Sequence, residues 1–359
     1  MTTSTSGHRA TGNDQARHIA AEELMQITAG FWSFKTLAAA VELGLFAALR
    51  DGRCLGRAEV AAELDIPDRP ADMLLAACAS LGLLRRERDG FANSALAEDL
   101  LVPGRRRYFG DFVLYADRRE YPAWLGAAEA LRTDRAQTWN PDEQESGYAV
   151  EDTMMTDLFW NAMHSLSSST AEALGDVVNL GSHRRLLDIG GGSGAYSLEL
   201  CRRNPGLTAT VYELPHVCEQ TAARIAEASL EHRVDTMPGD FRGLAAALPV
   251  GYDLLLLSMV LHCFDETACR DLLRKCRQAI EPGGTIMICE LLLNEDRSGP
   301  RLAALMGMNM VVESQGGRNY SELDYRTWLL DAGFGDVEVV RFHGAGANGV
   351  VVGRAGALP

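Results

Sequence analysis

One stretch, residues 185–200, constrains the fold more than any other, and it reads RLLDIGGGSGAYSLEL. Its opening apolar residues are typical of a short, buried parallel strand. Glycines at positions 190, 191, 192 and 194 follow at once, and residues 195–203 have the pattern of an amphipathic helix. Such a strand, glycine turn and helix start form a cradle for a ligand, because glycine lets ligand atoms approach the backbone and the helix offers free N–H groups.

The glycine pattern is compatible with two ligands. Gly190, Gly192 and Ala195 fit G-x-G-x-x-A, which is typical of nicotinamide dinucleotide sites. The longer string D-I-G-G-G-S-G, which begins at Asp188, resembles the first motif of methyltransferases that use S-adenosylmethionine. Glu213 ends the next apolar run, and a carboxylate there can accept hydrogen bonds from the ribose hydroxyls of either ligand. Both ligands remain open on this evidence.

Composition excludes several classes of partner. The 359 residues, 47% of them hydrophobic, are enough for two domains with a sizeable core. The net charge of −15 argues against a nucleic-acid partner, which needs basic surface. The eight cysteines form no C-x-x-C pair and read as reduced thiols of a cytoplasmic protein. No apolar run reaches membrane-spanning length, so we expect no membrane partner.

The first third of the chain is predicted to be a disordered tail, residues 1–18, and a helical domain, residues 19–110. Residues 31–46 (FWSFKTLAAAVELGLF) are more apolar than one buried helix face requires, which indicates a core or an oligomer interface. Residues 57–101 predict a winged helix. A DNA-binding regulator is disfavoured because Arg69 is the one basic residue in its reading helix. The predicted elements are helices 57–64 and 69–81 and a hairpin 83–92.

Residues 111–175 are predicted to be a helical connector rich in aromatic residues, interrupted by a polar loop at 140–150. Trp160 and Met163 on its last helix favour a flat, apolar acceptor. Residues 176–359 alternate between strand and helix patterns, which predicts an α/β domain with a doubly wound, Rossmann-like sheet of seven strands. The predicted strands are 186–189, 209–213, 233–237, 252–258, 285–292, 337–342 and 349–352.

Four further motifs follow the glycine turn in a fixed order. They are PGDF at 238–241, SMVLHCFD at 258–265, Cys289-Glu290, and NMVVESQGGRNYS at 309–321. Together with the glycine turn and Glu213, they resemble the S-adenosylmethionine-dependent O-methyltransferases of the plant caffeate and animal hydroxyindole type. Residues 31–46 also look like the dimerisation helix of that family, so the resemblance implies a homodimer through the N-terminal domain.

The resemblance implies a set of cofactor contacts. The glycine turn would hold the methionine part of S-adenosylmethionine, Glu213 the ribose, and Asp240 with Phe241 the adenine. Ser167 matches a position near the methionine carboxylate, and Ser258 stands where the family commonly has a lysine on the adenine side. The implied cofactor-binding residues are Gly190, Gly192, Glu213, Asp240, Phe241, Ser167 and Ser258.

The resemblance also implies the catalytic groups. His262 matches the general base and Glu290 a carboxylate that orients it. A phenol has a pKa near 10, so a base with a pKa nearer 7 assists its attack on the methyl carbon, and histidine is such a base. The product is S-adenosylhomocysteine, and no metal is required. The implied acceptor-contacting residues are Met163, Trp160, Asn309 and Glu313.

One departure from the family bears on the reaction. Asn319 stands where the family has a second histidine-orienting glutamate, and an amide cannot stabilise imidazolium by charge. C- or N-methylation of a related aromatic acceptor is therefore an open alternative. Two further alternatives remain open. One is a nicotinamide-dependent oxidoreductase, although no Tyr-x-x-x-Lys string follows the second or third strand. The other is a non-catalytic regulator that senses S-adenosylmethionine. The Ala, Arg and Gly bias indicates a GC-rich bacterium, in which such enzymes commonly tailor aromatic antibiotics.

Overall fold

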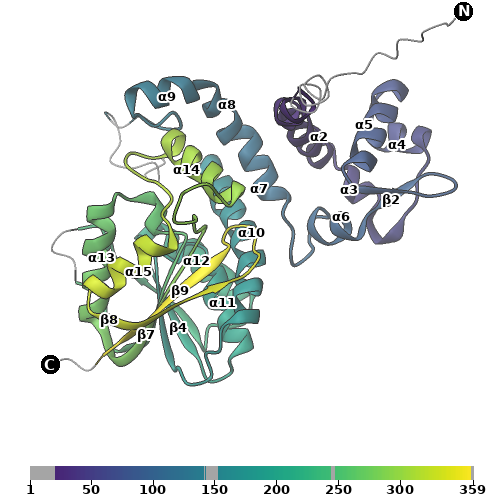
Figure 1. The fold of residues 1–359 in the computed structure, drawn as a ribbon. Coiled ribbons are helices and arrows are strands. Elements are labelled where there is room, and N and C mark those ends of the chain that lie inside the picture. Colours follow the sequence, from purple (N-terminus) through teal and green to yellow (C-terminus); the bar gives the residue numbers. More distant parts are fainter. Residues whose placement is uncertain (1–20, 141, 143–152, 244–246, 357–359) are drawn as a thin grey trace, which may run out of the picture. The chain divides into compact units, whose positions relative to one another are not determined.

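The computed structural model describes residues 21–140, 142, 153–243 and 247–356 (Figure 1). The chain divides into two compact units, Met1–Arg106 and Arg107–Pro359, and each is described by itself. The predicted tail, residues 1–18, lies outside the described residues, as does most of the predicted loop at 140–150. The aromatic-rich connector and the alternating strands and helices belong to the same unit.

The first unit contains the helices and hairpin predicted for a winged helix. Strands β1 and β2 pair antiparallel, with Leu84 opposite Asn93. The core beneath them is formed by apolar side chains such as Phe46, Leu49 and Leu75, which are fully buried. The elements are α2 (Gly30–Glu42), α3 (Leu45–Ala48), η1 (Arg50–Gly52), α4 (Arg57–Glu63), α5 (Asp68–Ser80), β1 (Leu84–Arg86), β2 (Phe91–Asn93) and α6 (Ala95–Leu100).

Large apolar side chains near the start of this unit are exposed within the chain. Trp32 is 58% exposed and Ile27 is 65% exposed, and Phe31 stacks edge-on against Trp32. Among the described residues, no single helix is long and apolar enough to cross a bilayer. One bent pair, Ala21–Glu42 and Leu45–Gly52, passes that test on length and composition alone.

A seven-stranded sheet with the order β5-β4-β3-β6-β7-β9-β8 organises the second unit. Neighbours from β5 to β7 are parallel, whereas β9 is inserted between β7 and β8 and runs antiparallel to both. The strands are β3 (Arg185–Ile189), β4 (Thr208–Glu213), β5 (Val234–Pro238), β6 (Tyr252–Ser258), β7 (Ile280–Glu290), β8 (Phe334–Arg341) and β9 (Gly349–Ala355). The predicted doubly wound, Rossmann-like sheet is confirmed.

Helices cover both faces of this sheet. One core contains side chains of α13 and α15, such as Leu273 and Trp328, and the other contains side chains of α10, α11 and α12, such as Leu174 and Ile225 (Figure 1). The helices are α10 (Thr153–Val177), α11 (Ala195–Arg203), α12 (Pro215–Glu227), η4 (Leu261–Cys263), α13 (Glu266–Ala279), α14 (Arg301–Glu313) and α15 (Glu322–Asp331).

Local sequence signals explain where several of these helices begin and end. The Asp265 side chain caps α13 by accepting a hydrogen bond from the Ala268 N–H, and Ser321 with Asp324 forms a capping box at the start of α15. One detail differs from the sequence-based prediction. The strand predicted at 285–292 begins earlier, because β7 starts at Ile280 and includes the Pro-Gly-Gly run at 282–284, with a shift in register against β6.

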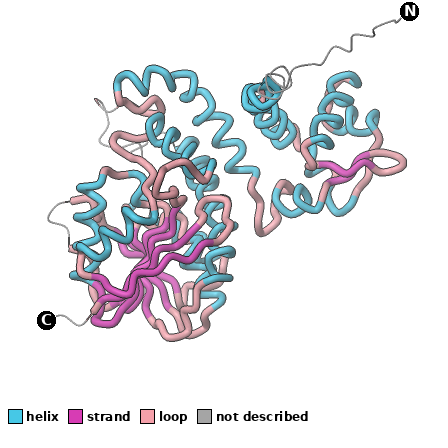
Figure 2. The backbone as a smooth tube through the Cα atoms, viewed as in Figure 1, coloured by secondary structure: helices cyan, strands magenta, loops and turns pink. Residues whose placement is uncertain are grey.

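The carboxyl edge of the sheet is covered by helical segments. Figure 2 shows α14 and the helical turns of residues 110–133 above this edge. Ala303 and Met306 of α14 pack on Leu291 and Leu293, which follow β7. The covering turns are α7 (Gly110–Tyr115), the π-helical turn η2 (Ala116–Glu120), α8 (Tyr121–Ala123), η3 (Trp124–Gly126) and α9 (Ala127–Thr133).

Candidate active site

The glycine turn after β3 has a backbone that side chains would obstruct. Gly190, Gly192 and Gly194 have positive φ angles of 67°, 53° and 74°. A Cβ atom at Gly190 would lie 3.2 Å from the Phe241 ring, and one at Gly192 would lie 3.0 Å from the Trp160 ring. The turn therefore brings bare backbone to the carboxyl edge of the sheet, beside two aromatic rings.

Two buried carboxyl groups flank this turn. Glu213, the last residue of β4, accepts hydrogen bonds from the Leu214 N–H at 2.8 Å and the Gly192 N–H at 3.3 Å. Burial raises the pKa of Glu213. Asp188, the residue before the last of β3, accepts a hydrogen bond from the Ser197 hydroxyl at 2.7 Å, and burial raises its pKa to about 7. A Cβ at Gly191 would lie 2.5 Å from the Asp188 carboxyl carbon, so this position has room for glycine alone.

The predicted adenine contacts follow β5 and β6 at the same edge. Asp240 is exposed, and its carboxylate accepts hydrogen bonds from the Arg242 backbone N–H and guanidinium, which lower its pKa. Phe241 is partly buried and packs edge-on against Phe264, with ring centroids 6.0 Å apart. Ser258, the last residue of β6, is buried. An adenine amine would have to share the Asp240 carboxylate with Arg242.

His262 and Glu290 form a buried pair. The Nδ1 atom of His262 lies 2.9 Å from Oε2 of Glu290, and the other carboxylate oxygen accepts the Leu261 N–H at 3.0 Å. Burial alone would lower the pKa of His262, but the neighbouring Cys263 and the Glu290 carboxylate outweigh it and hold the pKa well above its usual value. The imidazole is therefore more basic than an unperturbed histidine, although Asn319 stands where the family has a second glutamate.

Asn319 is buried beside this pair. Its Nδ2 donates a hydrogen bond to the Leu291 carbonyl at 2.9 Å, next to Glu290 in the chain. Its Oδ1 is enclosed and has no hydrogen-bond partner among the described residues. The amide is thus fixed through its nitrogen, and its oxygen remains an unused acceptor.

Helix α10 contributes one side of the site. Trp160 is buried against Gly192, and Met163 and Ser167 are partly buried on the same helix. The Nδ1 atom of His164, a residue outside the predicted site, lies 3.0 Å from the hydroxyl of Ser193 in the glycine turn. Burial lowers the pKa of His164 to about 4, so this imidazole is neutral at physiological pH.

Asn309 and Glu313 lie one turn apart on α14, as their spacing predicts. Asn309 accepts a hydrogen bond from the Trp124 indole N–H at 2.7 Å, and Glu313 lies 3.7 Å from the Arg119 guanidinium. Sequence reasoning missed Arg119 and its neighbour Glu120. The available signal was a charged run, 117–120 (DRRE), within an otherwise aromatic segment.

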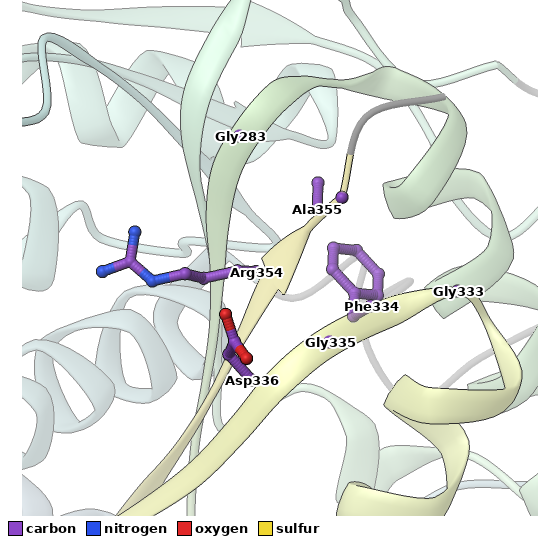
Figure 3. Close-up of a pocket in the computed structure, with 8 residues that line it drawn as sticks. Gly283, Gly333, Phe334, Gly335, Asp336, Arg354 and Ala355 are labelled. Carbon is purple, nitrogen blue, oxygen red and sulfur yellow. The ribbon is translucent and has the colours of Figure 1, made fainter. Parts of the chain in front are cut away.

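A cavity of about 520 Å³ lies elsewhere in the second unit, at the opposite edge of the sheet (Figure 3). It contains none of the predicted site residues. Its lining is formed by Gly283, Gly333, Phe334, Gly335, Asp336, Arg354, Ala355 and Gly356. Among the described residues, no group of three or more His, Cys, Asp or Glu side chains is placed to hold a metal ion.

Comparison with protein families gives two matches along the chain. Residues 124–335 match the O-methyltransferase domain, and residues 25–103 match the O-methyltransferase dimerisation domain. The chain belongs to the O-methyltransferase family. These matches confirm the family predicted from the motifs. The N-terminal unit of this methyltransferase contains the dimerisation domain of that family.

Individual relatives agree with the family match. The methyltransferase is 45% identical to the 3-hydroxy-5-methyl-1-naphthoate 3-O-methyltransferase of Streptomyces sahachiroi, over 92% of this chain and 94% of the relative. It is 30% identical to the tetracenomycin polyketide synthesis 8-O-methyl transferase of Streptomyces glaucescens, over 92% and 96%. Human N-acetylserotonin methyltransferase, solved in complex with S-adenosylmethionine, superposes with a TM-score of 0.80 at 29% identity, covering 94% of this chain and 98% of that one.

The family decides between the ligands that the glycine pattern left open. S-adenosylmethionine is the methyl donor, and a nicotinamide dinucleotide is not needed to explain the turn. The geometry fits that donor. The turn presents bare backbone with three left-handed glycines, and Glu213 ends the adjacent strand with lone pairs to spare for ribose hydroxyls. The Phe241 ring lies beside the turn, 3.2 Å from the Cβ position of Gly190.

Proposed function

We propose that this methyltransferase transfers the methyl group of S-adenosylmethionine to a hydroxyl group of a small aromatic molecule, with His262 as the general base. The observation that carries the proposal is the buried His262–Glu290 pair, with Nδ1 2.9 Å from the carboxylate, at the sheet edge that also holds the glycine turn. Both similar Streptomyces proteins are named as O-methyltransferases of aromatic compounds, which supports an aromatic hydroxyl as the acceptor.

The hydrogen bond to Glu290 defines which nitrogen of His262 does the chemistry. Because Nδ1 is held by the carboxylate, Nε2 is the atom that takes the acceptor's proton. Glu290 also stabilises the imidazolium that results, so the pair acts as one unit. General-base assistance of this kind contributes about 10²–10⁴-fold to a rate. When bound, S-adenosylmethionine supplies an electrophilic methyl group on a positively charged sulfur.

We assign the cofactor contacts as the motifs imply. Gly190 and Gly192 hold the methionine part, Glu213 holds the ribose, and Phe241 lies against the adenine. Asp240, Ser167 and Ser258 complete the set. The positions of these residues at the ends of β3, β4, β5 and β6 and on α10 support this assignment, since ligands bind at the carboxyl ends of parallel strands.

The acceptor is proposed to lie between α10 and α14, within the connector of residues 111–175. Trp160 and Met163 would form its apolar wall, and Asn309 and Glu313 would contribute polar contacts. The burial of Trp160 beside Gly192 supports this placement, because the transferred methyl group must lie near that turn. Asn319 has an enclosed oxygen that a ligand does not reach, so it would act on the base through the protein and not on the acceptor.

We further propose that the protein is a cytoplasmic homodimer formed through residues 19–110. The match of residues 25–103 to a dimerisation domain and the exposed Phe31 and Trp32 rings support the dimer. All eight cysteines are free thiols, as expected in a reducing compartment. The similarity to a polyketide-synthesis enzyme supports a role in bacterial secondary metabolism.

A screen of acceptors tests the proposed reaction. The protein is incubated with S-adenosylmethionine labelled with ¹³C in its methyl group and with paired hydroxyl, amine and carbon acceptors built on the same ring. We expect the label in methyl ethers. Label on a ring carbon or on nitrogen would favour the C- or N-methylation that Asn319 leaves open, and binding of S-adenosylmethionine without any transfer would favour the regulator.

A further inference from the structure

Two segments that are distant in the sequence, residues 115–120 and α14, meet and form what we call the Arg119 cluster: Tyr115, Arg119, Glu120, Asn309 and Glu313. The Arg119 Nη1 donates a hydrogen bond to the Tyr115 hydroxyl at 2.8 Å, and its guanidinium lies over the Tyr115 ring, 5.8 Å from the centroid. The Asn309 Nδ2 lies 3.5 Å from Oε1 of Glu120. These contacts hold the guanidinium in one orientation inside the second unit.

The guanidinium of Arg119 is partly buried and uses few of its hydrogen-bond donors. Its side chain is 15% exposed, and a guanidinium has five N–H donors. The hydrogen bond to Tyr115 uses one of them, and the Glu313 carboxylate at 3.7 Å is beyond hydrogen-bond distance. No Arg119 nitrogen is enclosed without a partner among the described residues, so its remaining donors are open to solvent and to a ligand. A ligand that bound them would replace water at a charged group that is already held in place.

The accessible unmet groups are donors rather than acceptors. Oε1 of Glu313 also lacks a partner, but that atom is fully enclosed and out of reach of a ligand. Burial raises the pKa of Glu313, and burial together with Glu313 raises the pKa of Glu120 to about 7. At neutral pH one of these carboxyl groups can therefore keep its proton. Arg119 and the two carboxyl groups are then neutral together, so they do not repel an incoming anion.

The cluster lies within reach of the proposed transfer site. The Phe159 ring contacts both the Tyr115 ring, at 5.6 Å, and the Trp160 ring, at 4.9 Å, and Trp160 packs on the glycine turn. On the other side, Gly307 in the middle of α14 lies beside Asn319, and Glu313 is the last residue of this helix, six residues further on. Six residues of α-helix rise about 9 Å. An aromatic molecule of one or two rings spans that distance with a hydroxyl at one end and an acidic group at the other.

We propose that Arg119 binds a carboxylate of the aromatic acceptor and thereby makes the enzyme selective for hydroxyarene carboxylic acids. This inference rests on the proposed function. Arginine suits the task because its planar fork binds both oxygens of a carboxylate through two parallel hydrogen bonds. The contact anchors the ring at the end remote from His262, so it determines which hydroxyl faces the methyl group.

The test compares each of several hydroxybenzoic and hydroxynaphthoic acids with its methyl ester, which keeps the ring and hydroxyl but loses the charge. For the preferred ring, we expect the wild-type protein to favour the acid over the ester at least 10-fold in kcat/KM. Arg119→Gln should raise KM for the acid about 100-fold, leave kcat within about threefold, and leave the ester unaffected. Arg118→Gln, at the exposed neighbouring position, is the matched control and should change neither.

The possible outcomes separate this inference from the proposed function. Two results would overturn the carboxylate contact and leave O-methylation intact. One is methylation of esters and acids with equal efficiency, and the other is an equal rise of KM for both in Arg119→Gln. Absence of transfer to every hydroxyarene would overturn the proposed function itself. Thermal unfolding of Arg119→Gln and of Arg119→Lys checks folding, and partial recovery of acid selectivity in the lysine variant would support recognition by charge.

Discussion

The Nδ1 atom of His262 lies 2.9 Å from Oε2 of Glu290, and both side chains are buried. The two residues are 28 positions apart: His262 lies in η4, which follows β6, and Glu290 is the last residue of the neighbouring parallel strand β7. The second oxygen of Glu290 accepts the Leu261 N–H, so the carboxylate is held from both sides. This relationship determines the tautomer of the imidazole and its basicity.

Replacing Glu290 by Gln should lower the pKa of His262, because the amide keeps a hydrogen-bond acceptor but removes the negative charge. The pKa of His262 in the wild-type protein is raised well above its usual value. The acidic limb of the kcat/KM profile, where the base becomes protonated, should therefore lie above the unperturbed imidazole pKa of about 6.5. In Glu290→Gln this limb should move to lower pH, and the plateau of kcat should fall about 10–100-fold. A limb that stays in place would show that another group titrates.

Replacing Glu213 by Gln should weaken cofactor binding without affecting the base. A hydrogen bond to a charged group contributes about 1.5–3 kcal/mol, so the dissociation constant of S-adenosylmethionine should rise about 10–100-fold in calorimetry. Asp235→Asn removes an exposed carboxylate from β5 and is the matched control, with no change expected. Unchanged affinity in Glu213→Gln would place the ribose elsewhere.

Asn319→Asp should destabilise the fold in a pH-dependent way. The new carboxylate would face the Leu291 carbonyl, which now accepts a hydrogen bond at 2.9 Å, in a buried place. Burial would raise the pKa of this Asp above its unfolded value of about 4, so stability is kept below pH 4 and lost as the pH rises. We expect a loss of about 2 kcal/mol at pH 7 in urea unfolding. The exposed Asn179→Asp should lose little, and equal stability of both variants at pH 7 would contradict the role of this contact.

Trp32→Glu should convert the proposed dimer into a monomer. Trp32 is 58% exposed within one chain and lies in the segment that matches a dimerisation domain. A charge at the centre of an apolar interface opposes association. Light scattering at micromolar concentration measures the mass, and Leu125→Glu, at an 84% exposed leucine of the other unit, should leave the dimer intact. A wild-type protein that is already monomeric would refute the dimer.

Much of the fold was predictable from local patterns. The alternation of strands and helices gave the doubly wound sheet, and the carboxyl ends of its strands brought Glu213, Phe241 and His262 to one edge, as such sheets require. The capping box at Ser321 is a local pattern of this kind, because Ser321 and its partner Asp324 lie within four residues of the chain. The insertion of β9 between β7 and β8 was not predictable from local patterns, since strand order depends on contacts between distant segments.

The Arg119 cluster shows why the acceptor side was harder to predict. Arg119 and Glu313 lie nearly 200 positions apart in the chain, and no periodicity connects a charged turn of residues 116–120 with the last turn of α14. Similarly, the contact of His164 with Ser193 depends on how α10 packs against the glycine turn. Motif spacing pointed to cofactor-binding residues at this edge only through resemblance to a family, and it carried no information on the residues around the proposed acceptor site.

The rate of a single turnover of His262→Ala, measured at saturating S-adenosylmethionine with the best hydroxyarene acceptor, tests the central claim most directly. Loss of the base should slow methyl transfer about 10²–10⁴-fold, while the dissociation constant of S-adenosylmethionine changes less than about threefold. Transfer within a few-fold of the wild-type rate would show that the reaction does not depend on His262.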